Sequence, residues 1–254
     1  MERTVDPVPR AAGRVAVVTG ASRGLGAGMA ARFATVGLGL GLAARTEPGA
    51  PPGSASVVAA VDVTDAAAVD RFCDTVIGRF GRIDLWVNNA GALGPIGPLR
   101  DVDPDGVREV VEVNVLGVLH GSAAFARHVR SRLGGGVLVN ITSGAARTPY
   151  AGWAAYCGAK AAVDQITRVV AVEEADAGLR AHAVAPGVVD TGMQAAIRAT
   201  GPERFPAVER FRALARHDGF NSPAWVADHV LALAFAPAGD EDVVVRVPDE
   251  PRER

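Results

Sequence analysis

The sequence predicts an α/β protein in which a doubly wound, seven-stranded parallel sheet carries helices on both faces. Short apolar, β-branched runs alternate with segments of helical periodicity along most of the 254 residues, a pattern typical of βαβ units. A glycine-rich turn follows the first run and opens the first helical segment. Since neither an internal repeat nor a linker interrupts this pattern, we expect one domain over residues 14–247, with flexible tails at 1–13 and 248–254.

Seven segments have the composition of strands. They span residues 14–19, 38–43, 56–61, 84–88, 137–142, 180–185 and 242–247. Gly39 and Gly41 weaken the second strand, and Pro186 stops the sixth. Because crossover helices join parallel strands, we expect the carboxyl ends of the strands to meet at one edge, where ligands of such sheets bind.

Helical periodicity marks the intervening segments. They span residues 25–36, 65–80, 105–133, 153–177 and 224–235. Thr64 or Asp65 can cap the second helix, and three glycines at 134–136 end the third.

Residues 190–222 depart from the alternating pattern. The segment is polar with scattered Met193, Phe205 and Phe211, a composition that favours a mobile lid for a substrate over a packed layer. The charged residues 248–254 are expected to be frayed.

Composition excludes several classes of protein. The net charge is −2 and charges of both signs are interspersed, so a nucleic-acid partner is not expected. Residues 1–13 lack an apolar leader core and no apolar run is long enough for a bilayer, which predicts a cytoplasmic protein without a membrane partner. Cys73 and Cys157 are too few for a disulfide framework, and the histidines are dispersed, so no metal site is expected.

The chemistry is centred on Ser143, Tyr156 and Lys160. On a helix, the i, i+4 spacing of Tyr156 and Lys160 puts phenol and ammonium on one face, where the cation can lower the pKa of the phenol. Tyr156 then becomes a proton donor near neutral pH. An isolated pair of this kind is more often a surface pair, so the neighbouring motifs must decide whether this pair is catalytic. Ser143 ends the fifth strand and is expected to point at the crevice that the helix with Tyr156 and Lys160 also faces.

The turn at residues 19–26 reads T-G-A-S-R-G-L-G. Gly20, Gly24 and Gly26 allow the backbone to approach a pyrophosphate at the helix N-terminus. The alternative is a tight strand-to-helix turn without a ligand.

Cofactor choice depends on the end of the second strand. Residues 43–46 read A-A-R-T and lack the acid that binds the ribose of NAD. Arg45 together with Arg23 can instead bind a 2′-phosphate. A cation at a helix N-terminus opposes the helix dipole, and a bound anion would explain Arg23. The alternative is that both arginines are only solvated.

Asn114 lies inside a long apolar helical segment. An asparagine is disfavoured there and needs a partner if it is buried. It either satisfies a local backbone group or distorts the helix and holds a water.

These motifs together resemble the classical short-chain dehydrogenase/reductase family, over nearly the whole stretch from residue 14 to 247. The matching pieces are T-G-x-x-x-G-x-G at 19–26, Asp62-Val63, N-N-A-G at 88–91, Asn114, Ser143, Y-x-x-x-K at 156–160 and P-G-x-x-x-T at 186–191.

The resemblance implies a Rossmann-type domain with Tyr156 as general acid and Ser143 orienting a carbonyl. Lys160 would bind the nicotinamide ribose and lower the pKa of Tyr156, while Asn114 would hold a water in a proton relay. Asp62 would contact the adenine, residues 89–91 the adenosine side, and Val188 and Thr191 the carboxamide. The full set expected to contact NADP(H) is Gly20, Ser22, Arg23, Gly24, Leu25, Gly26, Arg45, Thr46, Asp62, Val63, Asn89, Ala90, Gly91, Tyr156, Lys160, Pro186, Gly187, Val188, Val189, Thr191 and Met193.

A narrower resemblance lies in residues 151–160, 172–174, 185–194 and 93–99. These look like the sepiapterin reductase and bacterial benzil reductase branch, which reduces vicinal dicarbonyls with NADPH, and Trp153 and Cys157 carry part of the likeness. The chain departs from sepiapterin reductase near its C-terminus, where Val245-Arg246 stands in place of the acid that anchors the pterin.

The expectation is therefore an NADPH-dependent carbonyl reductase acting on a small-molecule ketone or vicinal diketone. Within the same class, a 3-oxoacyl carrier-protein reductase or a hydroxysteroid-type alcohol dehydrogenase remains open. A non-catalytic NADP-binding sensor or scaffold is the alternative of another class. The family resemblance implies a homodimer or homotetramer.

Overall fold

A seven-stranded parallel sheet forms the centre of the protein, as the sequence predicts, and its strands lie in the order β3-β2-β1-β4-β5-β6-β7. The computed structural model describes residues 11–236 and 242–252; the expected tails at 1–13 and 248–254 lie partly outside these ranges. The strands are β1 (Val15–Thr19), β2 (Gly39–Ala44), β3 (Ser56–Ala60), β4 (Leu85–Asn88), β5 (Gly136–Ile141), β6 (Leu179–Ala185) and β7 (Val244–Arg246).

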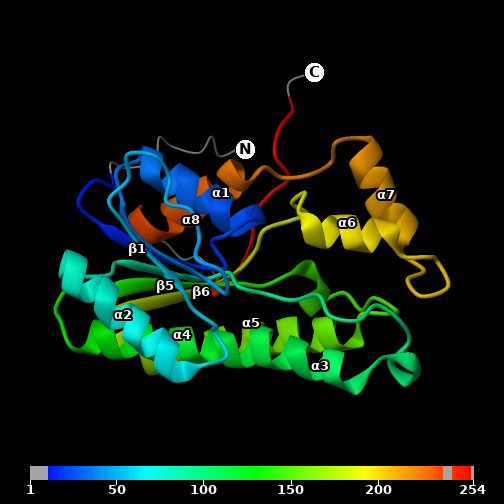
Figure 1. Ribbon diagram of the computed structural model, residues 1–254, viewed down its shortest axis with the longest axis horizontal. Helices are drawn as coiled ribbons and strands as arrows, with labels where there is room; N and C mark the ends of the chain where they lie inside the picture. Colours follow the sequence, from blue (N-terminus) through cyan, green and yellow to red (C-terminus); the bar gives the residue numbers. More distant parts are fainter. Residues whose placement is uncertain (1–10, 237–241, 253–254) are drawn as a thin grey trace.

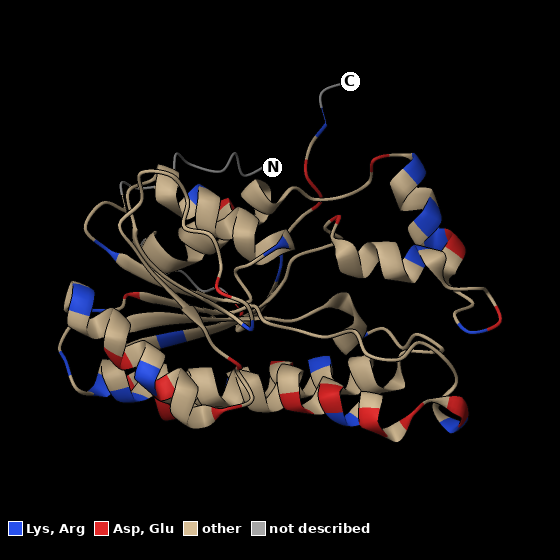
Figure 2. Ribbon diagram, in the orientation of Figure 1, with Lys and Arg blue, Asp and Glu red and all other residues tan. Residues whose placement is uncertain are grey.

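Helices cover both faces of the sheet. Figure 1 shows α1 (Gly24–Thr35) and α8 (Pro223–Phe235) on one face, and α2 (Ala66–Phe80), α4 (Gly117–Arg130) and α5 (Ala154–Glu173) on the other. Figure 2 shows acidic and basic residues interspersed along the helices of this second layer.

Both faces of the strands are buried. In β1, Ala16 and Val18 face the core under α1 and α8, whereas Val15 and Val17 face the core under α2 and α4. Burial on both faces explains why these strands are continuously apolar rather than alternating.

The expected single helix over residues 105–133 is wrong. The segment divides into α3 (Pro104–Val111), a π-helical turn (Glu112–Leu116) and α4. The fully buried Asn114 lies in the π-helical turn. Such a turn inserts one residue into the helical repeat and re-aims the side chains around it.

The 190–222 segment is folded and packed, which its composition did not indicate. It contains α6 (Gly192–Ala199) and α7 (Val208–Arg216). Its scattered apolar residues converge: Phe205 is fully buried and stacks on Trp153 with ring centroids 4.4 Å apart, and Phe211 lies 5.4 Å from Trp153. Sequence spacing could not show this convergence because the partner, Trp153, lies at the start of α5.

Residues 248–252 are bound to the domain, so the expected fraying is wrong for this part. Trp225 Nε1 donates to the carbonyl of Pro248 at 2.9 Å, and the backbone N–H of Ser222 donates to the carboxylate of Glu250 at 2.5 Å. At the other end, Ala11 is buried, so the packed core begins before residue 14.

Candidate active site

Ser143 and Tyr156 meet at the carboxyl end of β5. Ser143 is the second residue after the strand, has an extended conformation and caps the short turn Gly144–Ala146, accepting a hydrogen bond from the N–H of Ala145 at 3.2 Å. Tyr156 lies in the first turn of α5 and hydrogen-bonds the Ser143 side chain. Two segments 13 positions apart in the sequence thus bring a hydroxyl and a phenol into contact.

Lys160 lies one helical turn after Tyr156, and its side chain is buried. Its Nζ donates to the carbonyl of Ile141 at 2.8 Å and lies 5.8 Å from the centroid of the Tyr156 ring. Burial lowers the pKa of Lys160 to about 8, opposed by the nearby carboxylate of Asp164. The ammonium therefore loses its proton more readily than an exposed lysine.

The expectation that Lys160 lowers the pKa of Tyr156 does not hold in this structure. Burial raises the pKa of Tyr156, and the hydrogen bond from Ser143 opposes this only in part. Tyr156 is consequently held in its protonated form, the form that donates a proton.

Asn114 crosses to the loop after β4. Its Oδ1 accepts from the N–H of Ala92 at 2.9 Å and its Nδ2 donates to the carbonyl of Ala92 at 2.7 Å. The helix is distorted as one alternative expected, but the backbone partner belongs to a remote loop rather than to the helix. A Cβ placed on Gly91 would lie 3.1 Å from Asn114 Oδ1 and 3.9 Å from Lys160 Nζ, so these three residues share one corner.

The glycine turn after β1 is tightly built. Gly20 has a φ of +67°, and a Cβ there would lie 2.8 Å from the Cα of Ala90. A Cβ on Gly26 would lie 2.3 Å from the carbonyl oxygen of Gly20. The Asn89 side chain donates to the carbonyls of Thr19 and Gly20 at 2.9 and 3.2 Å. The amide of Asn89 thus fixes the turn, a role the resemblance did not imply.

The start of α1 fits a bound anion. Arg23 occupies the N-cap position without a side-chain cap bond, and the first turn carries no acidic residue. The first N–H groups of a helix point outward and favour negative charge. The residues present therefore fit the pyrophosphate of a dinucleotide.

Arg45 and Asp62 follow the ends of β2 and β3. Arg45 is exposed and forms a 3.5 Å ion pair with Glu109. Asp62 accepts from the N–H and hydroxyl of Thr64, and these bonds, with a smaller contribution from Arg45, lower the pKa of Asp62. Thr46 beside Arg45 is exposed, whereas Val63 is buried.

The loop after β6 faces the glycine turn. A Cβ on Gly24 would lie 3.1 Å from the side chain of Thr191. Gly187 has a φ of +74° and is overlaid by the amide of Asn221, whose Nδ2 would lie 2.6 Å from a Cβ there. Val189 is buried, and Met193 packs against the aromatic cluster around Trp153.

The predicted residues differ in where the structure places them. Gathered at the carboxyl edge of the sheet are Gly20, Gly24, Ala90, Gly91, Asn114, Ser143, Tyr156, Lys160, Pro186, Gly187, Val188 and Thr191. Leu25 and Val189 instead belong to the core under α1 and α8. Ser22 and Arg23 are exposed at the turn.

Sequence reasoning missed Asp164 and Asn221. Asp164 is buried one turn after Lys160 and accepts from Thr142 Oγ1 at 2.6 Å; its i, i+4 spacing from Lys160 was the available signal. Asn221 precedes Ser222-Pro223, a sequence typical of a helix start. Its bonds to the loop after β6 have no sequence signal.

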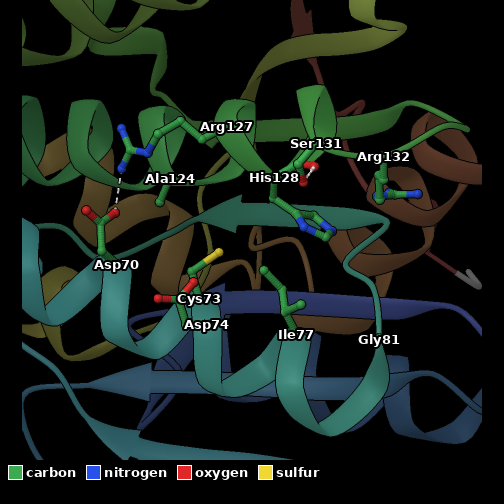
Figure 3. Close-up of a pocket in the computed structure, with 10 residues that line it drawn as sticks. All are labelled: Asp70, Cys73, Asp74, Ile77, Gly81, Ala124, Arg127, His128, Ser131 and Arg132. Atoms are coloured by element: carbon green, nitrogen blue, oxygen red, sulfur yellow. Dashed lines mark hydrogen bonds and ion pairs between the residues drawn. The ribbon is translucent and has the colours of Figure 1, made fainter.

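A pocket of about 510 Å³ lies away from this edge. It is lined by residues of α2 and α4, including Cys73, Arg127 and His128, and by Arg132 (Figure 3). His128 accepts from the N–H of Ile83, just before β4. The pocket is therefore at the amino end of the strand, opposite to Tyr156.

The fold and the edge that gathers these residues define a Rossmann-type α/β protein. A sequence profile of the short chain dehydrogenase family matches residues 14–201. The chain belongs to this family, as the motifs indicated, and is an oxidoreductase acting on CH–OH or C=O groups. Nicotinamide cofactors are typical of such enzymes.

Relatives in the family include both reductases and dehydrogenases. Benzil reductase ((S)-benzoin forming) of Bacillus subtilis (strain 168) is 32% identical over 224 residues, covering 85% of this chain and 91% of that reductase. The crystal structure of levodione reductase has a TM-score of 0.81 at 28% identity, covering 93% and 96% of the two chains. A 7α-hydroxysteroid dehydrogenase complexed with NADH and 7-oxo glycochenodeoxycholic acid has a TM-score of 0.75 at 25% identity, covering 92% and 91%.

Among residues 11–236 and 242–252, no helix is long and apolar enough to cross a membrane. The same part of the chain holds no group of three or more His, Cys, Asp or Glu residues arranged to bind a metal ion.

Proposed function

We propose that the protein is an NADPH-dependent carbonyl reductase that reduces a ketone or vicinal diketone. The observation that carries the proposal is the contact between the buried Tyr156 phenol and the Ser143 side chain. This pair lies at the same edge of the sheet as the uncapped start of α1. A carbonyl bound there would meet a proton donor and a second hydroxyl.

Each side chain has a distinct task in this proposal. Ser143 orients the carbonyl oxygen, and Tyr156 donates its proton to that oxygen as charge develops on it. Lys160 holds the ribose and returns a proton towards Tyr156, aided by a water on Asn114. The raised pKa of Tyr156 keeps the acid protonated at neutral pH. When bound, the nicotinamide supplies the hydride.

The preference for NADPH rests on charge. Arg45 and Arg23 are exposed at the ends of the turns that would flank the adenosine ribose, and the two residues directly after β2, Arg45 and Thr46, offer no carboxylate to a free 2′-hydroxyl. Asp62, Val63 and the loop after β6 complete the proposed cofactor contacts.

An aromatic cluster lies beside Tyr156 and supports a choice of substrate class. The Trp153 and Tyr156 rings lie 5.6 Å apart, and Phe205 and Phe211 pack behind Trp153. An aromatic wall next to the acid favours a flat apolar ketone. Together with the likeness to benzil reductase, this makes aryl vicinal diketones the first substrates to test. The 190–222 segment would serve as the substrate lid.

The test is a spectrophotometric panel of aryl diketones, quinones, pterins, oxosteroids and 3-oxoacyl thioesters with NADPH. Tyr156→Phe should lower kcat by about 10²- to 10⁴-fold, as expected when a positioned acid is lost. Tyr150→Phe is the matched control, because the Tyr150 hydroxyl is bonded to Arg210 at 2.8 Å rather than to Ser143. Near-normal turnover in Tyr156→Phe would disprove the mechanism.

Each alternative has its own signature in the same panel. Selective turnover of 3-oxoacyl thioesters or oxosteroids would favour a carrier-protein reductase or a hydroxysteroid dehydrogenase. The relative that binds 7-oxo glycochenodeoxycholic acid makes the steroid arm worth including. NADPH binding without consumption by any compound would favour a sensor or scaffold.

We further propose a homodimer or homotetramer. Leu116, Leu119, Val169 and Val172 are exposed apolar residues in the layer built by α4, its preceding π turn and α5. Val172 is 81% exposed, and burying such residues against a second copy is favourable. Light scattering should show an assembly that Val172→Glu weakens; a monomer in the native protein would contradict the proposal.

A further inference from the structure

Residues 248–252, here called the strap, cross the connection between α7 and α8. Figure 1 shows the red strap beside this orange connection. The Arg252 guanidinium pairs with Asp218 at 2.9 Å and donates to the carbonyl of Phe220 at 3.1 Å. Asp218 has a φ of +51° in the turn after α7. The strap therefore contacts the connection at its first residues as well as at the start of α8.

Glu250 attaches the strap to the start of α8. Its carboxylate accepts from the N–H and the hydroxyl of Ser222 at 2.5 and 2.9 Å. Ser222 is the N-cap of α8 and accepts from the N–H of Trp225. A negative charge at a helix N-terminus is favourable, and hydrogen bonds to a carboxylate are stronger than neutral ones. Glu250 is thus an anchor of the strap.

Asn221 connects the strap to the loop after β6. Its Nδ2 donates to two carbonyls, that of Pro248 at 3.1 Å and that of Pro186 at 3.0 Å. Its Oδ1 accepts from the N–H of Glu250 at 2.8 Å, and its own N–H donates to the carbonyl of Val188 at 2.8 Å. The residue is buried, so each of these bonds is shielded from competing water.

The loop after β6 is packed tightly against Asn221. The Asn221 amide lies against the Cα of Gly187, where a Cβ would come within 2.6 Å of it. Further along the same loop, Thr191 lies beside Gly24 of the glycine turn, where an added Cβ would come within 3.1 Å of the Thr191 side chain. A change in the position of residues 186–188 would therefore reach the edge where the nucleotide is proposed to bind.

We infer that Glu250 and Asn221 are positioning residues that hold residues 186–188 in the conformation that binds the nicotinamide cofactor. This inference rests on the proposed function for the identity of the ligand. The strap contributes no atom to the reaction. It keeps the binding-competent loop populated, and a protein whose competent state is partly lost binds its ligand more weakly in proportion. At saturating cofactor the loop is again in place.

Loss of the strap's anchor should change cofactor affinity but not turnover at saturation. Glu250→Ala should raise the KM and the Kd for NADPH by about 10-fold, as expected if roughly a tenth of the molecules keep the loop in place, while kcat at saturation stays within about 2-fold. Glu250→Gln keeps an acceptor for Ser222 and should restore most of the affinity. Asn221→Asp, which faces the carbonyls of Pro186 and Pro248 with an oxygen, should have the larger effect.

Asp249→Ala is the matched control. Asp249 is the adjacent acid in the strap, and its side chain is 86% exposed and pairs with Arg246 at 3.3 Å. Exposed pairs of this kind contribute little. The variant should leave KM, Kd and kcat unchanged.

Hydrogen exchange supplies a readout that does not depend on turnover. In Glu250→Ala, peptides covering residues 186–191 and 217–222 should exchange faster, with β1 and β5 unchanged. Faster exchange together with weaker NADPH binding, measured by fluorescence titration, supports the inference. Unchanged exchange, or faster exchange with an unchanged Kd, overturns it. If the native protein binds NADPH but reduces no carbonyl, the proposed function fails while the strap is still tested by exchange and affinity.

Discussion

The Nζ atom of Lys160 donates to the carbonyl oxygen of Ile141 at 2.8 Å and is buried with a pKa of about 8. The folded protein thus favours the neutral amine more than the unfolded chain does. Below pH 8 the lysine is charged in both states, and the fold bears the full cost of burying that charge. The cost declines as the pH rises from about 8 towards the unfolded pKa near 10.5.

Lys160→Met should therefore stabilise the protein without cofactor while abolishing activity. At pH 7 we expect a gain of roughly 1–3 kcal/mol in the free energy of unfolding, since one pKa unit corresponds to about 1.4 kcal/mol and the carbonyl of Ile141 loses a donor. The gain should shrink at pH 9.5. Urea denaturation at both pH values measures it, and a less stable variant at pH 7 would contradict the assigned cost.

Gly20 and Gly53 allow crowding to be separated from backbone strain. Both have positive φ values, +67° and +71°, but a Cβ on Gly20 would lie 2.8 Å from the Cα of Ala90, whereas no atom lies within 4 Å of one on Gly53. Gly53→Ala should cost only the conformational penalty, about 1–2 kcal/mol. Gly20→Ala should cost more and also weaken NADPH binding. Equal losses of stability in the two variants would refute the close packing of the turn.

His128 makes the fold sensitive to acid. Burial, with the charge of Arg132, lowers its pKa, and its Nε2 accepts from the N–H of Ile83 at 3.0 Å. A lowered pKa means that the fold favours neutral histidine. Its contribution to stability is complete above the unfolded pKa of 6.5 and is lost as the pH falls through the lower, folded pKa.

We expect the difference in Tm between the native protein and His128→Gln to change in favour of the variant between pH 7.5 and pH 5. Glutamine offers Ile83 an acceptor that does not titrate in this range. His229→Gln on α8 serves as the control substitution. A difference in Tm that is independent of pH would show that His128 does not titrate with folding.

Arg45 is expected to discriminate between the two nicotinamide cofactors. Arg45→Ala should raise the Kd for NADPH by about 10-fold or more, because a hydrogen bond to a charged group contributes about 1.5–3 kcal/mol, and should leave the Kd for NADH nearly unchanged. Arg71→Ala, a 70% exposed arginine near Asp65, is the control. Equal affinity of the native protein for the two cofactors would refute the phosphate interpretation.

Several features of the site followed from local sequence. The strand, glycine turn and helix at residues 15–35 were predicted to within about two residues, because glycine spacing and apolar runs act on their immediate neighbours. Asp65 caps α2 and was one of the two residues predicted to do so. The prediction of one long helix was wrong at Asn114, because the hydrogen-bond partner of Asn114 is Ala92, which lies 22 positions away in the sequence.

The packing of residues 190–222 was not predicted for the same reason. Phe205 and Phe211 have no periodic pattern of their own, and their burial depends on Trp153. Asn221 shows most clearly what local sequence cannot predict, since three of its hydrogen-bond partners lie on two loops at least 27 positions away in the sequence.

Chemistry between near neighbours is enough to predict the succession of strands along the chain, the glycine turn and the spacing of Tyr156 and Lys160. Where those side chains point depends on the folded structure. It assigned the Lys160 ammonium to the carbonyl of Ile141 and the amide of Asn221 to the loop at Pro186. Burial and hydrogen-bond partners depend on distant segments packing together, so the direction of each pKa shift and the role of the strap appear only in the folded chain.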